Sequence, residues 1–153
     1  MGVSTNGQLC YGVLFEEGFE FPWDEYDDIE DWWAKVKGFA PTVYPYNAEG
    51  DYAEGINAKS SEIDIYHNEK SEWEKANPIP VELVNYCSCD YPMYILTVPS
   101  ANYYNSRGDA VGIDPTKLLD EQGEAHDILI QFLKEFEIEY EDEPCWLLSS
   151  LWC

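Results

Sequence analysis

The fold of this chain depends most on residues 81–98, with the sequence VELVNYCSCDYPMYILTV. Two apolar runs rich in β-branched and aromatic residues lie here, separated by Cys89-Asp90-Tyr91-Pro92. This pattern predicts either a β-hairpin or one bent strand at a sheet edge, because proline cannot donate a ladder hydrogen bond. We therefore expect a sheet built around this stretch.

Further strands are predicted on both sides of it. Gln8–Phe15 (QLCYGVLF) is a short apolar run that ends at turn residues. Glu62–Tyr66 alternates between charged and apolar residues, which indicates an edge or surface strand. Near the end of the chain, Ile138, Tyr140 and the run Trp146–Leu148 predict strands that complete the sheet.

Two regions predict helices. Asp27 and Glu30 have the spacing of a capping box, which would begin a helix that continues through Trp32 and Trp33. Asp114-Pro115 is a second helix start, and Gly123 would interrupt that helix. Beyond Gly123, apolar residues recur at helical spacing, namely Ile128, Leu129, Phe132, Leu133 and Phe136.

The order of these elements favours the α+β class. We expect a single compact domain over residues 1–153, with a mainly antiparallel sheet and two or three helices, since 153 residues suit one domain. The sequence has neither a membrane-length apolar run nor a secretory leader, so we expect a cytoplasmic protein.

The charge is the strongest functional signal. The chain has 31 acidic and eight basic residues, a formal net charge of −23, whereas a magnitude of roughly 2–8 serves a small domain. With 16% aromatic and 45% hydrophobic residues it is not of the disordered acidic class. Such a surface attracts basic proteins and repels nucleic acid and anionic membranes. We therefore expect a basic protein partner, with no direct binding of nucleic acid or membrane.

The segment Glu135–Glu141 alternates strictly between glutamate and apolar residues. In a strand, Glu137, Glu139 and Glu141 would share one face at intervals of about 6.6 Å. Phosphates along one nucleic-acid strand, with about 3.4 Å of rise each, are spaced similarly once the winding of the backbone is included. These glutamates, extended by Asp142 and Glu143, could therefore imitate phosphates toward a Lys/Arg-lined groove. The alternatives are a charged edge strand that prevents aggregation, or the end of the preceding helix.

A second acidic block, Glu16–Asp31, has no Lys or Arg. Its candidate binding residues are Asp24, Asp27 and Asp28, with Trp23 as an aromatic anchor. Acidic residues accelerate association, and buried aromatic anchors slow dissociation. The alternative is an acidic loop followed by the first turn of a helix.

Catalytic and metal-binding patterns are sparse. Five cysteines form an odd set, so free thiols are expected. Cys87 and Cys89, even with His67, lack the second pair that structural zinc sites use. From Asp24 onward the EF-hand pattern fails, because Tyr26 and Ile29 occupy ligand position 3 and the glycine position. We expect no catalytic residues, cofactor or metal.

The chain resembles small acidic proteins of bacteriophages and prophages in four segments: YGVLFEEGFEFPW (11–23), DIEDWW (28–33), VELVNYCSCDYPMYIL (81–96) and WLLSSLW (146–152). The resemblance implies a viral protein that acts in the bacterial cytoplasm. By analogy of charge and setting, such proteins resemble DNA mimics that inhibit nucleases, restriction systems or CRISPR effectors.

The favoured interpretation is a non-enzymatic inhibitor or adaptor that binds a basic, nucleic-acid-binding host protein. One alternative is a phage structural or housekeeping protein whose acidity only gives solubility. Another is a small metal- or thiol-dependent enzyme.

Overall fold

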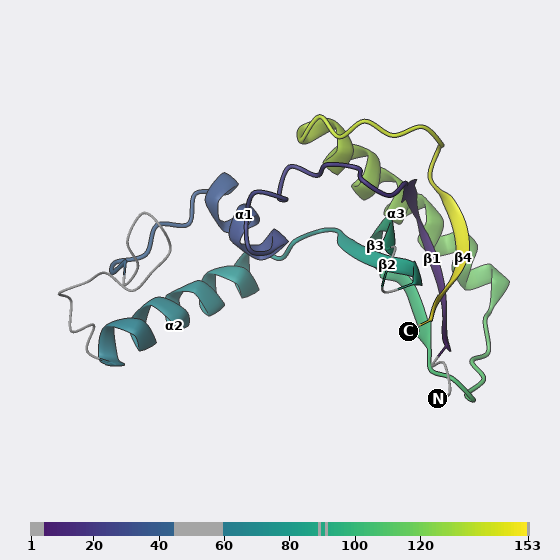
Figure 1. Cartoon of the computed structure of the whole chain (residues 1–153), viewed down its shortest axis with the longest axis horizontal. Helices are drawn as coiled ribbons and strands as arrows, with labels where there is room; N and C mark the ends of the chain where they lie inside the picture. Colours follow the sequence, from purple (N-terminus) through teal and green to yellow (C-terminus); the bar gives the residue numbers. More distant parts are fainter. Residues whose placement is uncertain (1–4, 45–59, 89, 91, 153) are drawn as a thin grey trace. The chain divides into compact units, whose positions relative to one another are not determined.

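Four strands form one sheet that closes on itself in the order β1-β3-β2-β4 (Figure 1). The computed structural model describes residues 5–44, 60–88, 90 and 92–152. The strands are β1 (Thr5–Phe15), β2 (Glu82–Ser88), β3 (Pro92–Asn105) and β4 (Cys145–Trp152). β1 is antiparallel to β3 and β4, β2 is antiparallel to β3, and a short parallel pairing of β2 with β4 closes the sheet. The sheet is thus mainly antiparallel, as predicted.

Residues 81–98 form a hairpin rather than one bent strand. β2 and β3 pair with Val84 opposite Ile95 and Tyr86 opposite Met93. On its other edge, β3 pairs with β1 along residues 94–97. After a register shift between Cys10 and Gly12, it pairs with β1 again along residues 102–105. The stretch with the strongest β pattern is therefore the part of the chain that joins the first strand to the rest of the sheet.

Three helices complete the α+β fold that the sequence predicts: α1 (Ile29–Val36), α2 (Ser60–Ala76) and α3 (Pro115–Glu135). None of them, in the part of the chain that is described, has the length and apolarity that a membrane span requires.

The chain divides into two compact units. The strand unit comprises Met1–Pro22 and Pro80–Cys153 and contains the sheet and α3, whereas the helical unit, Trp23–Ile79, contains α1 and α2. The single domain expected over residues 1–153 stays a prediction.

The sheet and α3 together form the core of the strand unit. Inside the closed sheet, Cys10, Val84 and Ile95 form a buried cluster, against which Tyr86 and Leu147 pack. On the outside, α3 packs against β1 and β3 (Figure 1). The buried face of α3 has the spacing of an amphipathic helix, with Ala125, Leu129, Phe132 and Leu133.

The helical unit has its own aromatic core. Trp32 and Trp33 of α1 are buried, and the ring of Trp23 lies 5.2 Å from that of Trp32. The Trp33 indole donates a hydrogen bond of 2.9 Å to the carbonyl oxygen of Asn77, just after α2. Lys70 of α2 forms an ion pair with Asp31 of α1, so polar contacts also join the two helices.

The strand expected at Glu62–Tyr66 is wrong, because these residues belong to α2. Ile63, Tyr66 and Trp73 are all half-buried, and their spacing of three and seven residues is helical rather than alternating. The five-residue window happened to fit both periods, and only the longer segment distinguishes them.

The predicted helix starts are close to those observed. α1 begins one residue later than expected, since Asp28 rather than Asp27 is the N-cap and accepts a hydrogen bond of 2.7 Å from the Asp31 amide. Asp114 caps α3 as predicted. The predicted interruption at Gly123 is wrong, because α3 is continuous from Pro115 to Glu135; a glycine weakens a helix by only about 1 kcal/mol.

Gly12 lies where β1 approaches β3 most closely. A Cβ atom at this position would be 2.5 Å from the carbonyl oxygen of Leu96 and 2.7 Å from a side-chain carbon of Ile95. The Leu96 backbone and the buried Ile95 side chain cannot both move aside without a loss of stability. A Cβ atom added at Gly7, in the same strand, would have no other atom within 4 Å. The two glycines therefore differ in their tolerance of a methyl group.

We predict that Gly12→Ala lowers the free energy of unfolding by about 1–3 kcal/mol, since it overpacks a filled core. Gly7→Ala is the matched control and should be neutral or slightly stabilising. Urea denaturation followed by circular dichroism measures both. Equal stability of the two variants would contradict the close approach of β1 and β3.

Candidate partner-binding site

The carboxyl end of α3 is closed by a Schellman motif. The amide of Ile138 donates to the Leu133 carbonyl (2.9 Å), and the amide of Glu137 donates to the Lys134 carbonyl (3.4 Å). Glu137 occupies the left-handed position of this motif, with φ 53°, where glycine is the usual residue. The helix therefore ends with a glutamate in a backbone conformation that is unfavourable for any residue with a Cβ atom.

The strand predicted for Glu135–Glu141 is consequently wrong. Glu135 is the last residue of α3, Phe136 is its C-cap, and residues 138–140 are in irregular, non-helical structure. Phe136 completes the apolar face of the helix, its ring lying 4.8 Å from that of Phe132, so the helical period extends further than the alternation suggested. A ladder with regular β spacing does not exist in this segment.

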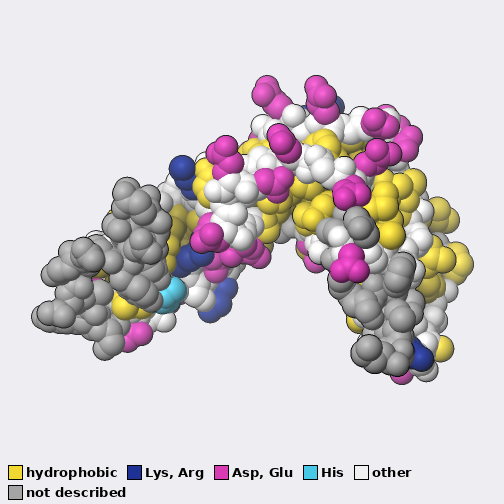
Figure 2. Space-filling view, viewed as in Figure 1, with side chains coloured by type: hydrophobic (Ala, Val, Ile, Leu, Met, Phe, Trp, Pro, Cys, Tyr) yellow, Lys and Arg dark blue, Asp and Glu magenta, His cyan; other side chains and the backbone are white. Residues whose placement is uncertain are grey.

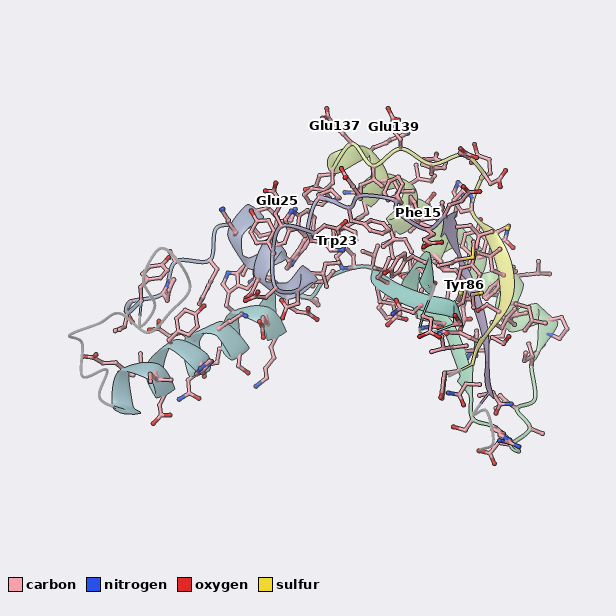
Figure 3. The ribbon with its side chains drawn as sticks, in the orientation of Figure 1. Phe15, Trp23, Glu25, Tyr86, Glu137 and Glu139 are labelled. Atoms are coloured by element: carbon pink, nitrogen blue, oxygen red, sulfur yellow. The ribbon has the colours of Figure 1, made fainter. Side chains whose placement is uncertain are left out.

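The acidic side chains nevertheless lie outward. We name Glu137, Glu139, Glu141, Asp142 and Glu143 the acidic row; all five are exposed, while Ile138 between them is 5% exposed and Tyr140 is half-buried. Figure 2 shows acidic side chains gathered along the end of α3 and the segment after it. In Figure 3, the side chains of Glu137 and Glu139 point away from the ribbon. The predicted division into an acidic and an apolar side thus survives without a strand.

A hydrogen bond at Pro144 holds the other end of the acidic row in place. The hydroxyl of Tyr11, on β1, donates a hydrogen bond of 2.9 Å to the Pro144 carbonyl. That hydroxyl has one hydrogen, so its contact of 3.1 Å with Nδ1 of His126 requires the histidine to donate. β1, α3 and the acidic segment therefore meet at one hydrogen-bonded point.

A second acidic turn follows β1. The amide of Phe19 bonds to the Glu16 carbonyl (3.3 Å), and Gly18 between them has φ 83°, as the third residue of a type II turn requires. Phe15, Phe19 and Phe21 pack against one another beside this turn in tilted and edge-to-face contacts, with ring separations of 4.5–5.0 Å. The aromatic contacts hold Glu16 and Glu17 at the end of the sheet, where both are exposed.

These two acidic segments enclose a pocket of about 500 Å³, which we name the acid–aromatic pocket. Its lining combines carboxylates with aromatic and apolar side chains: Leu14, Phe15, Glu16, Glu17, Gly18, Phe19, Tyr86, Met93, Glu139, Tyr140, Glu141 and Asp142. Phe15 comes from β1 and Tyr86 from β2 (Figure 3). The pocket thus joins part of the acidic row to residues more than 100 positions earlier in the chain.

No protein-family model matches this chain, and neither a curated protein nor a solved structure is detectably similar to it. The properties of the site therefore follow from the side chains that form it.

The potential in the acid–aromatic pocket is negative. Of the described residues that line it, none is basic. Burial, together with the nearby Cys87 thiol and the Glu16 carboxylate, raises the pKa of Tyr86 above its ordinary value. Glu16 is thus close enough for its charge to act on the Tyr86 hydroxyl. A cationic group is the ligand that this field favours.

The acidic block Glu16–Asp31 is divided between the two units, which the sequence did not indicate. Asp24, Asp27 and Asp28 are exposed in the helical unit, whereas Glu16 and Glu17 belong to the strand unit. The Asp28 side chain serves as the N-cap of α1. The structure therefore brings none of these three aspartates into the acid–aromatic pocket.

Trp23, the predicted aromatic anchor, is buried in this structure. Its side chain is 6% exposed and packs against the Trp32 ring, so it belongs to the core of the helical unit. The acidic neighbours of Trp23 suggested exposure, but Trp32 and Trp33 provide an apolar surface that a third indole covers. In the strand unit, the half-buried aromatic side chains of Phe19 and Tyr140 line the acid–aromatic pocket.

The sequence did not indicate that Glu16 and Glu17, the first residues of the second acidic block, would line one pocket with Tyr86, Met93 and Tyr140. The only local signal was the turn sequence Glu16-Glu17-Gly18 directly after a strand. That signal identifies a loop end, but it does not show which distant segment lies beside it.

The cysteines do not form a shared centre in the described part of the chain. Cys10, Cys87 and Cys145 are free thiols, as expected. Among the residues with defined positions, no three His, Cys, Asp or Glu side chains converge as a metal ion requires. Cys89, a predicted zinc candidate that was disfavoured, lies outside the described residues.

We predict that Glu137→Gly raises the free energy of unfolding by about 1 kcal/mol, because it relieves the left-handed backbone strain. Glu139→Gly is the matched control: it removes the same charge from an exposed position without a positive φ and should be neutral or slightly destabilising. Chemical denaturation compares the two. If Glu139→Gly stabilised the protein equally, charge relief rather than the backbone would be the cause.

We predict that Cys10 reacts with iodoacetamide at pH 8 at least about 100-fold more slowly than the exposed Cys145. Burial raises the pKa of the Cys10 thiol to about 11, so only about one in a thousand thiols is ionised at this pH. Peptide mapping by mass spectrometry measures both rates. Rapid labelling of Cys10 in the folded protein would contradict its burial.

Proposed function

We propose that this protein is a non-enzymatic inhibitor or adaptor that binds the basic, nucleic-acid-binding surface of another protein. The acidic row and the acid–aromatic pocket would form the contact, and the mechanism is competitive occlusion. Carboxylates pair with the lysines and arginines that otherwise hold phosphates, and thereby exclude the nucleic acid.

The observation that carries the proposal is the acidic row itself. Residues 137–143 contain five acidic residues and no basic one, and all five carboxylates are exposed. The Schellman motif fixes one end of the row and the hydrogen bond from Tyr11 to Pro144 fixes the other. An ordered row loses less conformational entropy on binding than a flexible acidic tail would.

The distribution of charge supports the strand unit as the main binding element. Its residues include 17 acidic and three basic ones, a formal charge of −14, whereas the helical unit has 14 acidic and five basic ones, a charge of −9. A field of this sign concentrates basic partners near the surface and accelerates their association. Asp24, Asp27 and Asp28 add to that long-range attraction.

The conformation of Glu137 is a further support. A non-glycine residue at the left-handed position costs on the order of 1 kcal/mol, and glycine would avoid this cost. The presence of a carboxylate at this strained position agrees with a use for it at the surface.

The setting that we propose is a bacteriophage or prophage protein in the cytoplasm of its bacterial host. The candidate targets are enzymes with a basic groove for nucleic acid, such as nucleases, restriction enzymes and CRISPR effectors. This setting is the one that a resemblance of four segments to small acidic phage proteins would imply.

One observation favours a second candidate, a structural or housekeeping phage protein that self-associates. Leu148 of β4 and Leu119 of α3 are 82% and 71% exposed, and exposed apolar side chains mark interaction surfaces where they are contiguous. Self-association through such residues would make the acidity only a means of solubility.

We predict that Glu137→Gln/Glu139→Gln/Glu141→Gln weakens partner binding by about 3- to 150-fold, as expected from three exposed ion pairs of about 0.2–1 kcal/mol each. The matched control, Asp109→Asn/Asp120→Asn/Glu124→Gln, removes the same charge from other exposed positions of the strand unit. Tagged protein is incubated with bacterial lysate, washed at low and high salt, and challenged with duplex DNA.

The expected result is a nucleic-acid-binding protein that high salt or duplex DNA releases, and that the first triple variant retains poorly but the control retains well. Retention that is equal for both variants would show that the acidic row is not the binding surface. Recovery of nothing but the tagged protein, together with oligomers in analytical ultracentrifugation, would favour the structural candidate.

A further inference from the structure

We propose that the acid–aromatic pocket holds a single arginine side chain of the partner. This assignment rests on the proposed function and deepens it, because it names the group that the pocket recognises. Arginine fits three properties of the pocket: its walls, its charge and the spread of its carboxylates.

The walls of the pocket are suited to an amphipathic side chain. Phe15, Phe19, Tyr86 and Tyr140 are aromatic, and Leu14 and Met93 are apolar. A guanidinium group stacks on aromatic faces, and the three methylene groups of the arginine stem pack on apolar surface. A free metal ion or a simple ammonium ion would leave these walls unused.

The carboxylates around the pocket are spread rather than convergent. Glu16 and Glu17 come from the turn after β1, and Glu141 and Asp142 come from the acidic row. In the described part of the chain, no three such groups are close enough together to hold a metal ion. Guanidinium presents five N–H donors in a planar fork, so it can reach acceptors on opposite sides, which a compact ammonium cannot do equally well.

The size of the pocket is also appropriate. Its volume of about 500 Å³ falls within the range of roughly 300–1,000 Å³ that is typical of small-ligand sites. An arginine with part of its flanking backbone fits such a space. The pocket would thus add an anchor with a defined position to the diffuse attraction of the acidic row.

The test is a titration of the isotope-labelled full chain with the peptide Ac-Gly-Gly-Arg-Gly-Gly-NH₂, followed by NMR. Peptides with citrulline or lysine in place of arginine are the matched probes, since citrulline keeps the shape and removes the charge. We expect saturable shifts at Gly18, Phe19, Tyr86 and Tyr140, at least about tenfold weaker binding of the citrulline peptide, and weaker binding of the lysine peptide.

Two variants locate the binding. Glu16→Gln/Asp142→Asn should weaken arginine-peptide binding by about tenfold or more, whereas Asp109→Asn/Glu124→Gln, with the same charge change, should not. Tyr140→Leu keeps the apolar volume, and it should weaken binding several-fold through loss of the aromatic face. The dispersion of the spectrum of each variant reports whether it remains folded.

Absent shifts at the pocket would overturn the assignment, as would equal binding of the arginine and citrulline peptides or equal effects of the two double variants. A lysine peptide that binds as tightly as the arginine peptide would overturn the choice of arginine. Octa-arginine separates this proposal from the proposed function. If it binds and Glu137→Gln/Glu139→Gln/Glu141→Gln weakens it while the single-arginine peptide does not bind, the pocket assignment fails and the acidic surface stands.

Discussion

The pairing of β1 on both edges is the constraint from which the rest of the strand unit follows. β1 bonds to β3 on one side and to β4 on the other, and Gly12 lies opposite Cys145 in the second pairing. Continuation of that antiparallel register past the last pair would bring Glu141 level with Glu16. The chain between α3 and β4 must therefore pass beside the turn that follows β1, and the two acidic segments meet as a result of the topology.

Such a meeting is electrostatically unfavourable and needs compensation. Carboxylates that approach one another repel, and a formal charge of −23 adds to this repulsion over the whole molecule. The opposing contributions are local: the edge-to-face and tilted contacts of Phe15, Phe19 and Phe21, the buried Ile138, and the hydrogen bond to Pro144. The acidic site is thus held in place by the packing beneath it, and a cationic partner would relieve the repulsion that remains.

Elements with a long or chemically specific signal could be predicted from the sequence. The hairpin at residues 81–98 and the start of α3 at Asp114-Pro115 are of this kind. Short stretches in which charged and apolar residues alternate gave a wrong strand prediction twice, at Glu62–Tyr66 and at Glu135–Glu141. A few residues fit the periods of helix and strand equally well. The Schellman motif at Glu137 lacked its usual glycine, and the acid–aromatic pocket depends on contacts across more than 100 residues. Neither had a local signal strong enough to be found.

The acidic row is not a strand, so its carboxylates are not evenly spaced, but all of them remain exposed. A strand would have spaced its carboxylates evenly and left a free edge that could pair with other chains. An irregular segment fixed at both ends has no such edge, and its spacing is set by where Ile138 and Tyr140 pack. Phosphates on a nucleic acid also wind around an axis rather than follow a straight line. The proposed mimicry would therefore not require a flat ladder, and the orientation of each carboxylate depends on the core rather than on β geometry.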